Sequence, residues 1–212
     1  MPAKPSDRQY RAMTVTLTPP EEGADKRFDS KYYVEGYAST FDDPYVLFED
    51  FNGNEYREIV SPDAFSDCDM SDVIMQYDHR GHVYARMSNE TLIVEPDDHG
   101  LFVAADLARS QRGRDLYEEI QSGLTTRMSW AFSVAADEYN RETKTTTITK
   151  VKKIYDVSAV SLPADPNTEI SARNLLDGVI EQSAKEFGRR NRALAIARAA
   201  IAVNKKGLRN GH

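Results

Sequence analysis

Alternating apolar and polar residues, the pattern of half-buried β-strands, dominate the chain as far as residue 161. Turn-forming pairs such as Pro19-Pro20 and Asn52-Gly53 interrupt the alternation. The segments that it marks cover residues 10–18, 32–41, 45–60, 73–77, 82–87, 91–95, 101–107, 127–136 and 145–161. The pattern therefore predicts a β-rich body.

Two short helices are predicted within this body. Ser61 followed by Pro62 marks a helix start, because proline fits the first helical turn. Ser110 is a helix cap, and Gly123 ends the helix that follows it. The apolar face of that second helix consists of Leu116, Tyr117 and Ile120. The fold class is therefore predicted to be α+β, with the strands forming most of it.

The period changes from that of strands to that of a helix from Asn174 onward. Apolar residues recur every seven positions as one stripe on a long helix, at Ile180, Phe187, Leu194 and Ile201. Three parts are predicted: an N-terminal strand with a flexible segment over 1–30, a main domain over 31–173, and a helical C-terminal arm over 174–212.

The charge is divided unevenly along the chain. Its net charge is −7, but residues 185–212 hold eight of the 27 Lys and Arg and only one of the 34 Asp and Glu. An acidic body argues against a nucleic-acid-binding core. The basic arm could contact an acidic partner, or its charges could simply lie on a solvated helix face.

Composition also indicates the cellular compartment in which the protein is expected. No apolar run approaches the roughly 18 residues of a membrane helix, so no membrane contact is expected. The N-terminus lacks the apolar core of a secretory signal. Cys68 is the only cysteine, which excludes an intrachain disulfide and a cysteine metal cluster. These features fit a reducing cytoplasm.

Candidate chemistry centres on Ser129, a small hydroxyl within the apolar run from Leu124 to Val134. His79, at the end of a predicted strand, is the best candidate base for it. Asp156 is an acid in an otherwise apolar strand, and burial would require a partner for it. Each has an alternative without chemistry: a serine packed on backbone, a surface histidine, and an acid paired with Arg or Lys or facing outward.

A metal site is the other chemical possibility, because several histidines and acids occur in two short segments. These residues are Asp78, His79, His82, Asp97, Asp98 and His99. They lack compact ligand spacing such as His-Glu-x-x-His. No metal and no other cofactor is therefore expected, and His82 and His99 are weaker candidates for the base than His79.

Several segments, taken together in order, resemble the prohead maturation proteases of tailed bacteriophages, a family related to the herpesvirus capsid-assembly proteases. Each segment is a weak match alone, but their order and spacing make the set specific. The matching segments are Val34 to Phe41, Glu58 to Phe65, Tyr77-Asp78-His79, Gly100 to Leu107, Met128 to Phe132, and Asp156 to Pro166.

The resemblance implies a serine endopeptidase with Ser129 as nucleophile, His79 as general base and Asp156 in the place of the third, orienting member. It implies a mixed, mostly antiparallel β-barrel surrounded by short helices, and a homodimer. The implied substrates are the scaffold or the coat protein's scaffolding segment, and the protease itself, inside the immature capsid in the host cytoplasm. The alternatives are an inactive, protease-like assembly protein and, with less support, a metal-dependent hydrolase.

Overall fold

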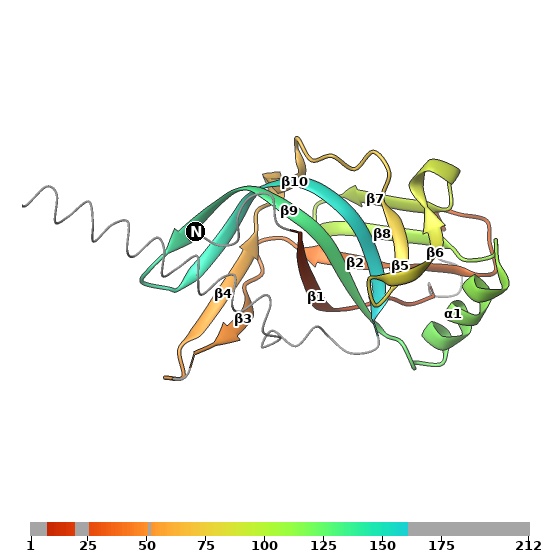
Figure 1. Cartoon of the computed structure of the whole chain (residues 1–212), viewed down its shortest axis with the longest axis horizontal. Helices are drawn as coiled ribbons and strands as arrows, with labels where there is room; N and C mark the ends of the chain where they lie inside the picture. Colours follow the sequence, from red (N-terminus) through yellow and green to blue (C-terminus); the bar gives the residue numbers. More distant parts are fainter. Residues whose placement is uncertain (1–7, 20–25, 51, 161–212) are drawn as a thin grey trace, which may run out of the picture. The chain divides into compact units, whose positions relative to one another are not determined.

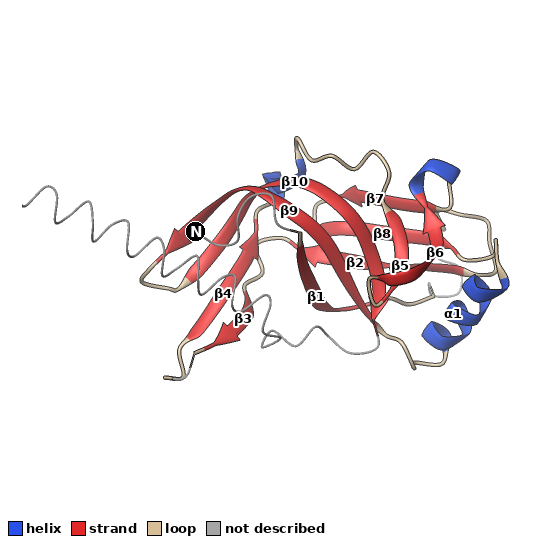
Figure 2. Ribbon diagram, viewed as in Figure 1, coloured by secondary structure: helices blue, strands red, loops and turns tan. Residues whose placement is uncertain are grey.

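A computed structural model describes residues 8–19, 26–50 and 52–160, all of which belong to one compact unit of the chain, Pro5–Ala172. Strands make up most of the described chain, and its only α-helix is α1, Gln111–Gln121 (Figure 2). Two 3-10 helices accompany it, η1 at Pro62–Phe65 and η2 at Met87–Asn89. The α+β class is confirmed in this coarse sense.

The larger of two sheets has seven strands and is organised around the hairpin of β9 and β10 (Figure 1). Its main order is β1 (Gln9–Thr16), β9 (Arg127–Asn140), β10 (Thr145–Val160), β4 (Glu55–Val60) and β3 (Tyr45–Glu49). Beyond β4, the C-terminal half of β10 pairs in parallel with β5 (Ile74–Tyr77), which pairs in turn with β6 (Arg80–Arg86). Parallel and antiparallel pairs occur together, so the sheet is mixed as expected.

The smaller sheet is antiparallel and consists of β2 (Tyr33–Thr40), β8 (Gly100–Asp106) and β7 (Leu92–Pro96), in that order. An isolated bridge between Thr18 and Glu35 connects the segment after β1 to β2. Gly100 is required where β8 meets β2, because a Cβ there would lie 2.0 Å from the carbonyl oxygen of Ser39. The hydrogen-bonded strand order closes no barrel among the described residues, so the predicted barrel is not confirmed.

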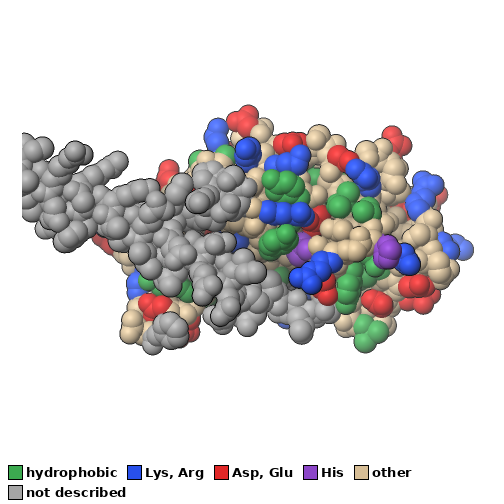
Figure 3. Space-filling model, viewed as in Figure 1, with side chains coloured by type: hydrophobic (Ala, Val, Ile, Leu, Met, Phe, Trp, Pro, Cys, Tyr) green, Lys and Arg blue, Asp and Glu red, His purple; other side chains and the backbone are tan. Residues whose placement is uncertain are grey.

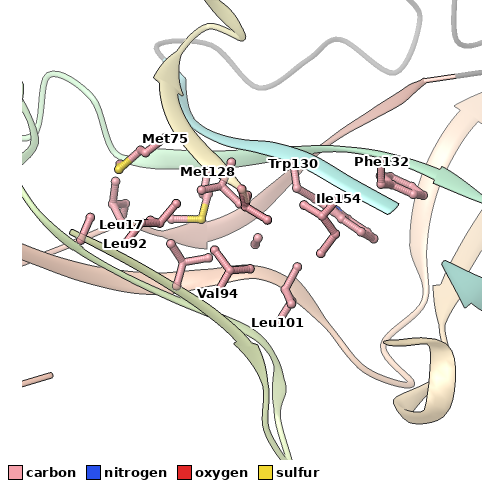
Figure 4. Close-up of a cluster of buried hydrophobic side chains, with 14 of the residues drawn as sticks. Leu17, Met75, Leu92, Val94, Leu101, Met128, Trp130, Phe132 and Ile154 are labelled. Atoms are coloured by element: carbon pink, nitrogen blue, oxygen red, sulfur yellow. The ribbon is translucent and has the colours of Figure 1, made fainter. Parts of the chain in front are cut away.

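The core lies between the sheets and is filled by side chains from one face of each. Figure 4 shows buried residues of β9 together with buried residues of β7 and β8. The rings of Trp130 and Phe132 on β9 stack with their centroids 3.7 Å apart. Since successive residues of a strand point to opposite faces, this buried row directs Ser129 and Ala131 to the other face of β9. That face carries the candidate site.

The helices form largely where the sequence predicts them. Ser110 caps α1 by accepting a hydrogen bond from the backbone N–H of Gly113 at 3.0 Å. Leu116 and Ile120 are buried on the face of α1 that was expected to be apolar. The segment after Ser61 is a single 3-10 turn, and the Ser61 side chain makes no capping bond. The predicted C-terminal arm, 174–212, lies outside the described residues.

Among the described residues, no helix is long and apolar enough to span a membrane.

Candidate active site

Ser129 lies in the middle of the larger sheet, with a strand on either side. Its Cα partner on β1 is Ala12, and its partner on β10 is Ser158. Only 1% of Ser129 is exposed to solvent. Hydrogen-bonded strands on both sides fix the backbone of this serine, so its hydroxyl has a defined direction.

His79 lies in the tight turn that joins β5 to β6. Tyr77 pairs with Arg80, which leaves Asp78 and His79 as a two-residue loop. Both have positive φ, 47° for Asp78 and 57° for His79, as a type I′ hairpin turn requires. Residues with a Cβ rarely adopt this conformation, and strain of this kind is typical of functional sites.

Backbone contacts with β10 hold this turn in place. The N–H of Asp78 donates to the carbonyl oxygen of Ala159 at 3.0 Å. The N–H of His79 donates to the hydroxyl of Ser158 at 3.2 Å. Because β9 and β10 are paired residue by residue here, these contacts fix the imidazole of His79 relative to Ser129 on the next strand.

The three candidate residues form one chain of hydrogen bonds. His79 Nε2 lies 2.6 Å from Ser129 Oγ, and His79 Nδ1 lies 2.5 Å from Asp156 Oδ1. A carboxylate only accepts hydrogen bonds, so the proton belongs on Nδ1 and Nε2 accepts from the serine hydroxyl. In this tautomer His79 can take the Ser129 proton directly.

Asp156 is fully buried, and its carboxylate receives hydrogen bonds at both oxygens. Oδ1 accepts from His79 Nδ1 and, at 3.0 Å, from the hydroxyl of Ser158. Oδ2 accepts from Nη2 of Arg8, which also forms an ion pair with Asp156. The sequence analysis allowed a histidine partner or an arginine partner for this acid, and in the structure Asp156 contacts both.

Two aromatic rings complete the surroundings of the site. The ring of Tyr10 meets the imidazole of His79 edge to face, with centroids 4.7 Å apart. The guanidinium of Arg8 lies 5.4 Å from the Tyr10 ring centroid and 4.8 Å from that of Tyr155. Figure 3 shows histidine side chains on the drawn face of the molecule, next to basic side chains.

The sequence analysis did not identify Ser158, Arg8 or Tyr10. Ser158 is two residues after Asp156 on the same strand, and this spacing places both side chains on one face of the sheet. Arg8 fell within residues 1–9, which have no clear periodicity, and Tyr10 was read only as the start of a strand. The alternation of Arg8, Tyr10 and Ala12 was the available signal, but it identifies no partner strand.

Asp78 lies beside His79 in the same turn, but His82, His99 and Asp97 of the metal set considered above make their contacts elsewhere. His82 contacts Arg112 of α1, with Nδ1 3.0 Å from Nη1 of the arginine. The ring of His99 packs against Tyr37, with centroids 4.6 Å apart, and Asp97 accepts a hydrogen bond from the Tyr37 hydroxyl. Throughout the part of the chain that the structure describes, no three His, Cys, Asp or Glu side chains gather as a possible metal site.

A serine, a histidine and a buried carboxylate bonded in this order form the triad arrangement that serine hydrolases use. Comparison with protein families makes the class specific: residues 21–182 match the model of the caudovirus prohead serine proteases, and the chain belongs to this family. The matched region includes His79, Ser129 and Asp156.

The chain is also similar to the prohead protease of Enterobacteria phage HK97, with 28% identity over 149 residues. The aligned region covers 68% of this chain and 61% of that protein, so the chain spans less than two thirds of the relative's length. No solved structure was found to match the chain.

Proposed function

We propose that the chain is a serine endopeptidase of phage prohead maturation. The observation that carries this proposal is the unbroken contact from Ser129 Oγ through His79 to the buried carboxylate of Asp156. Family membership supports the same reaction class. The protease domain is proposed to span residues 31–173, with the N-terminal strand contributing to it.

The proposed chemistry is acyl transfer through Ser129. Ser129 Oγ attacks the carbonyl carbon of the scissile peptide while its proton passes to His79 Nε2. Asp156 holds the imidazole in the required tautomer and stabilises the positive charge that forms on it. His79 then donates the proton to the leaving amine. In the second half of the reaction His79 takes a proton from water, which attacks the acyl carbon, and then returns a proton to Ser129 Oγ as the acyl group leaves.

The proposed substrates are the scaffold protein or the scaffolding segment of the coat protein, together with the protease itself. The proposed place of action is the assembling prohead in the host cytoplasm, and the proposed assembly is a homodimer. The family description and the name of the phage HK97 relative support the prohead as the place of action and capsid or scaffold proteins as substrates. Self-cleavage and the homodimer rest on the sequence resemblance alone. The relationship to herpesvirus assembly proteases, and the barrel that it implies, remain predictions.

The basic arm, residues 174–212, is proposed to dock the protease in the assembling shell. Its support is the sequence alone: a seven-residue apolar repeat and an excess of Lys and Arg after an acidic body. Packing on its own domain or on a second copy of the chain is the alternative.

The experiment that tests the proposed activity is covalent labelling with a fluorophosphonate, which reacts with activated serines. The full chain should be labelled at Ser129, and Ser129→Ala should remove the label. Ser133→Ala is the matched control, because Ser133 is buried on the same strand and face and its hydroxyl has no hydrogen-bond partner among the described residues. Absence of labelling in the wild-type chain would favour the inactive assembly protein instead.

A further inference from the structure

We infer that Arg8 is a positioning residue for the proposed reaction, acting through Asp156 and reaching the site from the segment just before β1. The inference rests on the proposed roles of Ser129, His79 and Asp156. Its basis is the geometry of one carboxylate, whose two oxygens have different kinds of partner.

The two carboxylate oxygens of Asp156 have different hydrogen-bond partners. Oδ1 receives the histidine and the neutral hydroxyl of Ser158, while Oδ2 receives the guanidinium of Arg8. The torsion that rotates a carboxylate about its Cβ–Cγ bond is soft, so bonds at one oxygen alone fix its plane poorly. A cation bound at the second oxygen fixes that plane, and with it the direction of the bond to His79.

Burial makes this contact important energetically. The side chain of Asp156 is fully buried, whereas 39% of the Arg8 side chain is exposed. A buried carboxylate needs compensating charge or several donors, because desolvation of an unpaired charge is expensive. Arg8 supplies the charge while its side chain stays partly exposed to solvent, so the pair avoids the full cost of burying two ions.

Arg8 is itself held by contacts with two aromatic rings. Its guanidinium lies near the rings of Tyr10 and Tyr155, and Tyr10 contacts the imidazole of His79 in turn. Alternation along β1 explains this placement, since Tyr10 pairs with Ala131 and Ala12 pairs with Ser129 on the face that carries the site. Arg8 continues the same alternation by two residues.

The opposite face of β1 is anchored independently. Arg11 forms a buried, two-pronged ion pair with Glu58 of β4, with Nε–Oε1 at 2.6 Å and Nη2–Oε2 at 2.9 Å. β1 is therefore held to the sheet by Arg11 whether or not Arg8 binds Asp156. Removing the Arg8 side chain should therefore change the orientation of the Asp156 carboxylate without detaching β1 from the sheet.

This role is specific to the N-terminal segment of the chain. The family match begins at residue 21, so Arg8 and Tyr10 lie outside it. The triad residues lie inside it, and the structure assigns their anchor to a segment that the family match does not include.

The test uses the full-length chain and the rate at which a small fluorophosphonate labels Ser129. Measuring the rate against reagent concentration gives the maximal rate and the half-saturating concentration separately. Arg8→Ala should lower the maximal rate about 10- to 100-fold, the size expected when a reacting group is misplaced by about 1 Å. The half-saturating concentration should stay within about twofold, because the inferred role of Arg8 is to orient Asp156 and not to bind the reagent.

Two further measurements separate positioning from mere structural support. Arg8→Lys should retain an intermediate rate, since an ammonium supplies charge without the planar fork. Millimolar methylguanidine should restore part of the rate to Arg8→Ala by occupying the vacated site at Asp156 Oδ2. A variant that had only lost fold stability would not respond to this cation.

Arg27→Ala is the matched control. Arg27 is also a partly exposed arginine with a carboxylate partner, Glu95, and an aromatic ring, Phe102, but it binds the smaller sheet. Its removal should leave the labelling rate unchanged and methylguanidine without effect.

Several outcomes would overturn the inferred role of Arg8 while leaving the proposed function unaffected. Wild-type rates in Arg8→Ala would show that Asp156 needs no second anchor. A faster rate would show that repulsion between the Arg8 charge and the imidazolium of His79 slows the reaction more than the contact with Asp156 speeds it. Equal losses in Arg8→Ala and Arg8→Lys, without rescue by methylguanidine, would indicate a structural role. Labelling that persists in Ser129→Ala would instead refute the proposed nucleophile.

Discussion

Ser129 and Ser158 lie directly opposite each other on β9 and β10, but their hydroxyls have different partners. The hydroxyl of Ser129 is 2.6 Å from Nε2 of His79. The hydroxyl of Ser158 donates to Asp156 Oδ1 at 3.0 Å and accepts from the backbone N–H of His79 at 3.2 Å. The register of this strand pair therefore places the Ser129 hydroxyl at Nε2 of His79, the nitrogen that accepts the proton. It places the Ser158 hydroxyl between Asp156 and the backbone N–H of His79.

This difference predicts unequal effects of two chemically identical changes. Ser129→Ala should abolish fluorophosphonate labelling, because it removes the proposed nucleophile. Ser158→Ala should only slow it, by about tenfold, and should destabilise the fold by about 1.5–3 kcal/mol, the range for a hydrogen bond to a charged group. Labelling kinetics and urea unfolding measure the two effects. A Ser158→Ala variant as inert as Ser129→Ala would contradict the assignment of the nucleophile.

Asp156→Asn should reduce activity strongly but leave more of it than Ser129→Ala does. An asparagine has the same shape, but its amide cannot stabilise the imidazolium, and it favours the wrong tautomer of His79. The ion pair with Arg8 is lost in the same variant. Cleavage of a scaffold substrate, compared across the three proteins, is the measurement, and full activity in Asp156→Asn would remove Asp156 from the site.

The turn at Asp78 and His79 gives a prediction about the backbone. Asp78 has a φ of 47°, and a β-branched residue there should cost about 1–3 kcal/mol of strain. Asp78→Val should therefore lower the urea midpoint and slow labelling, because the turn carries His79. Asp78→Asn is the control, since asparagine tolerates this conformation far better. Equal midpoints for the two variants would show that the turn relaxes without cost.

Local patterns were enough to predict most of the strands and α1, and they marked Ser129, His79 and Asp156 as separate candidates. Their combination as a triad came from the resemblance to the prohead proteases. Runs of apolar and strand-forming residues marked β9 and β10, and Ser110 and Gly123 marked the ends of α1. Local patterns could not predict that β10 pairs in parallel with both β4 and β5, because pairing between distant strands depends on contacts that no local pattern encodes. Arg8 escaped notice for the same reason, since its partner is 148 residues away.

The basic arm gives a prediction that separates localisation from chemistry. Deleting residues 174–212 should reduce incorporation of the protease into proheads more than its labelling rate as a free protein, if the arm docks it to an acidic partner. Quantifying the protease in purified proheads against the labelling rate checks this. A charge-reversal control, Lys205→Glu with Lys206→Glu, should reproduce part of the loss. Unchanged incorporation after deletion would refute the docking role.

Asp72 and Arg86 form an ion pair at the base of the β5–β6 hairpin that carries His79. Arg86 Nε lies 3.0 Å from Oδ1 and 2.9 Å from Oδ2 of Asp72. The side-chain hydrogen bond from Arg86 lowers the pKa of Asp72 to about 2 from an ordinary value of 3.8. Because the folded-state pKa is the lower one, folding favours the ionised carboxylate.

The stabilisation is therefore fully present above about pH 4 and is lost as the pH falls toward 2. Asp72→Asn should lower the urea midpoint at pH 7, and its difference from wild type should shrink steadily between pH 4 and 2. Asp63→Asn, a change at an exposed acid of η1, is the control and should show no such convergence. A difference that stayed constant with pH would mean that the pair contributes through shape and not through charge.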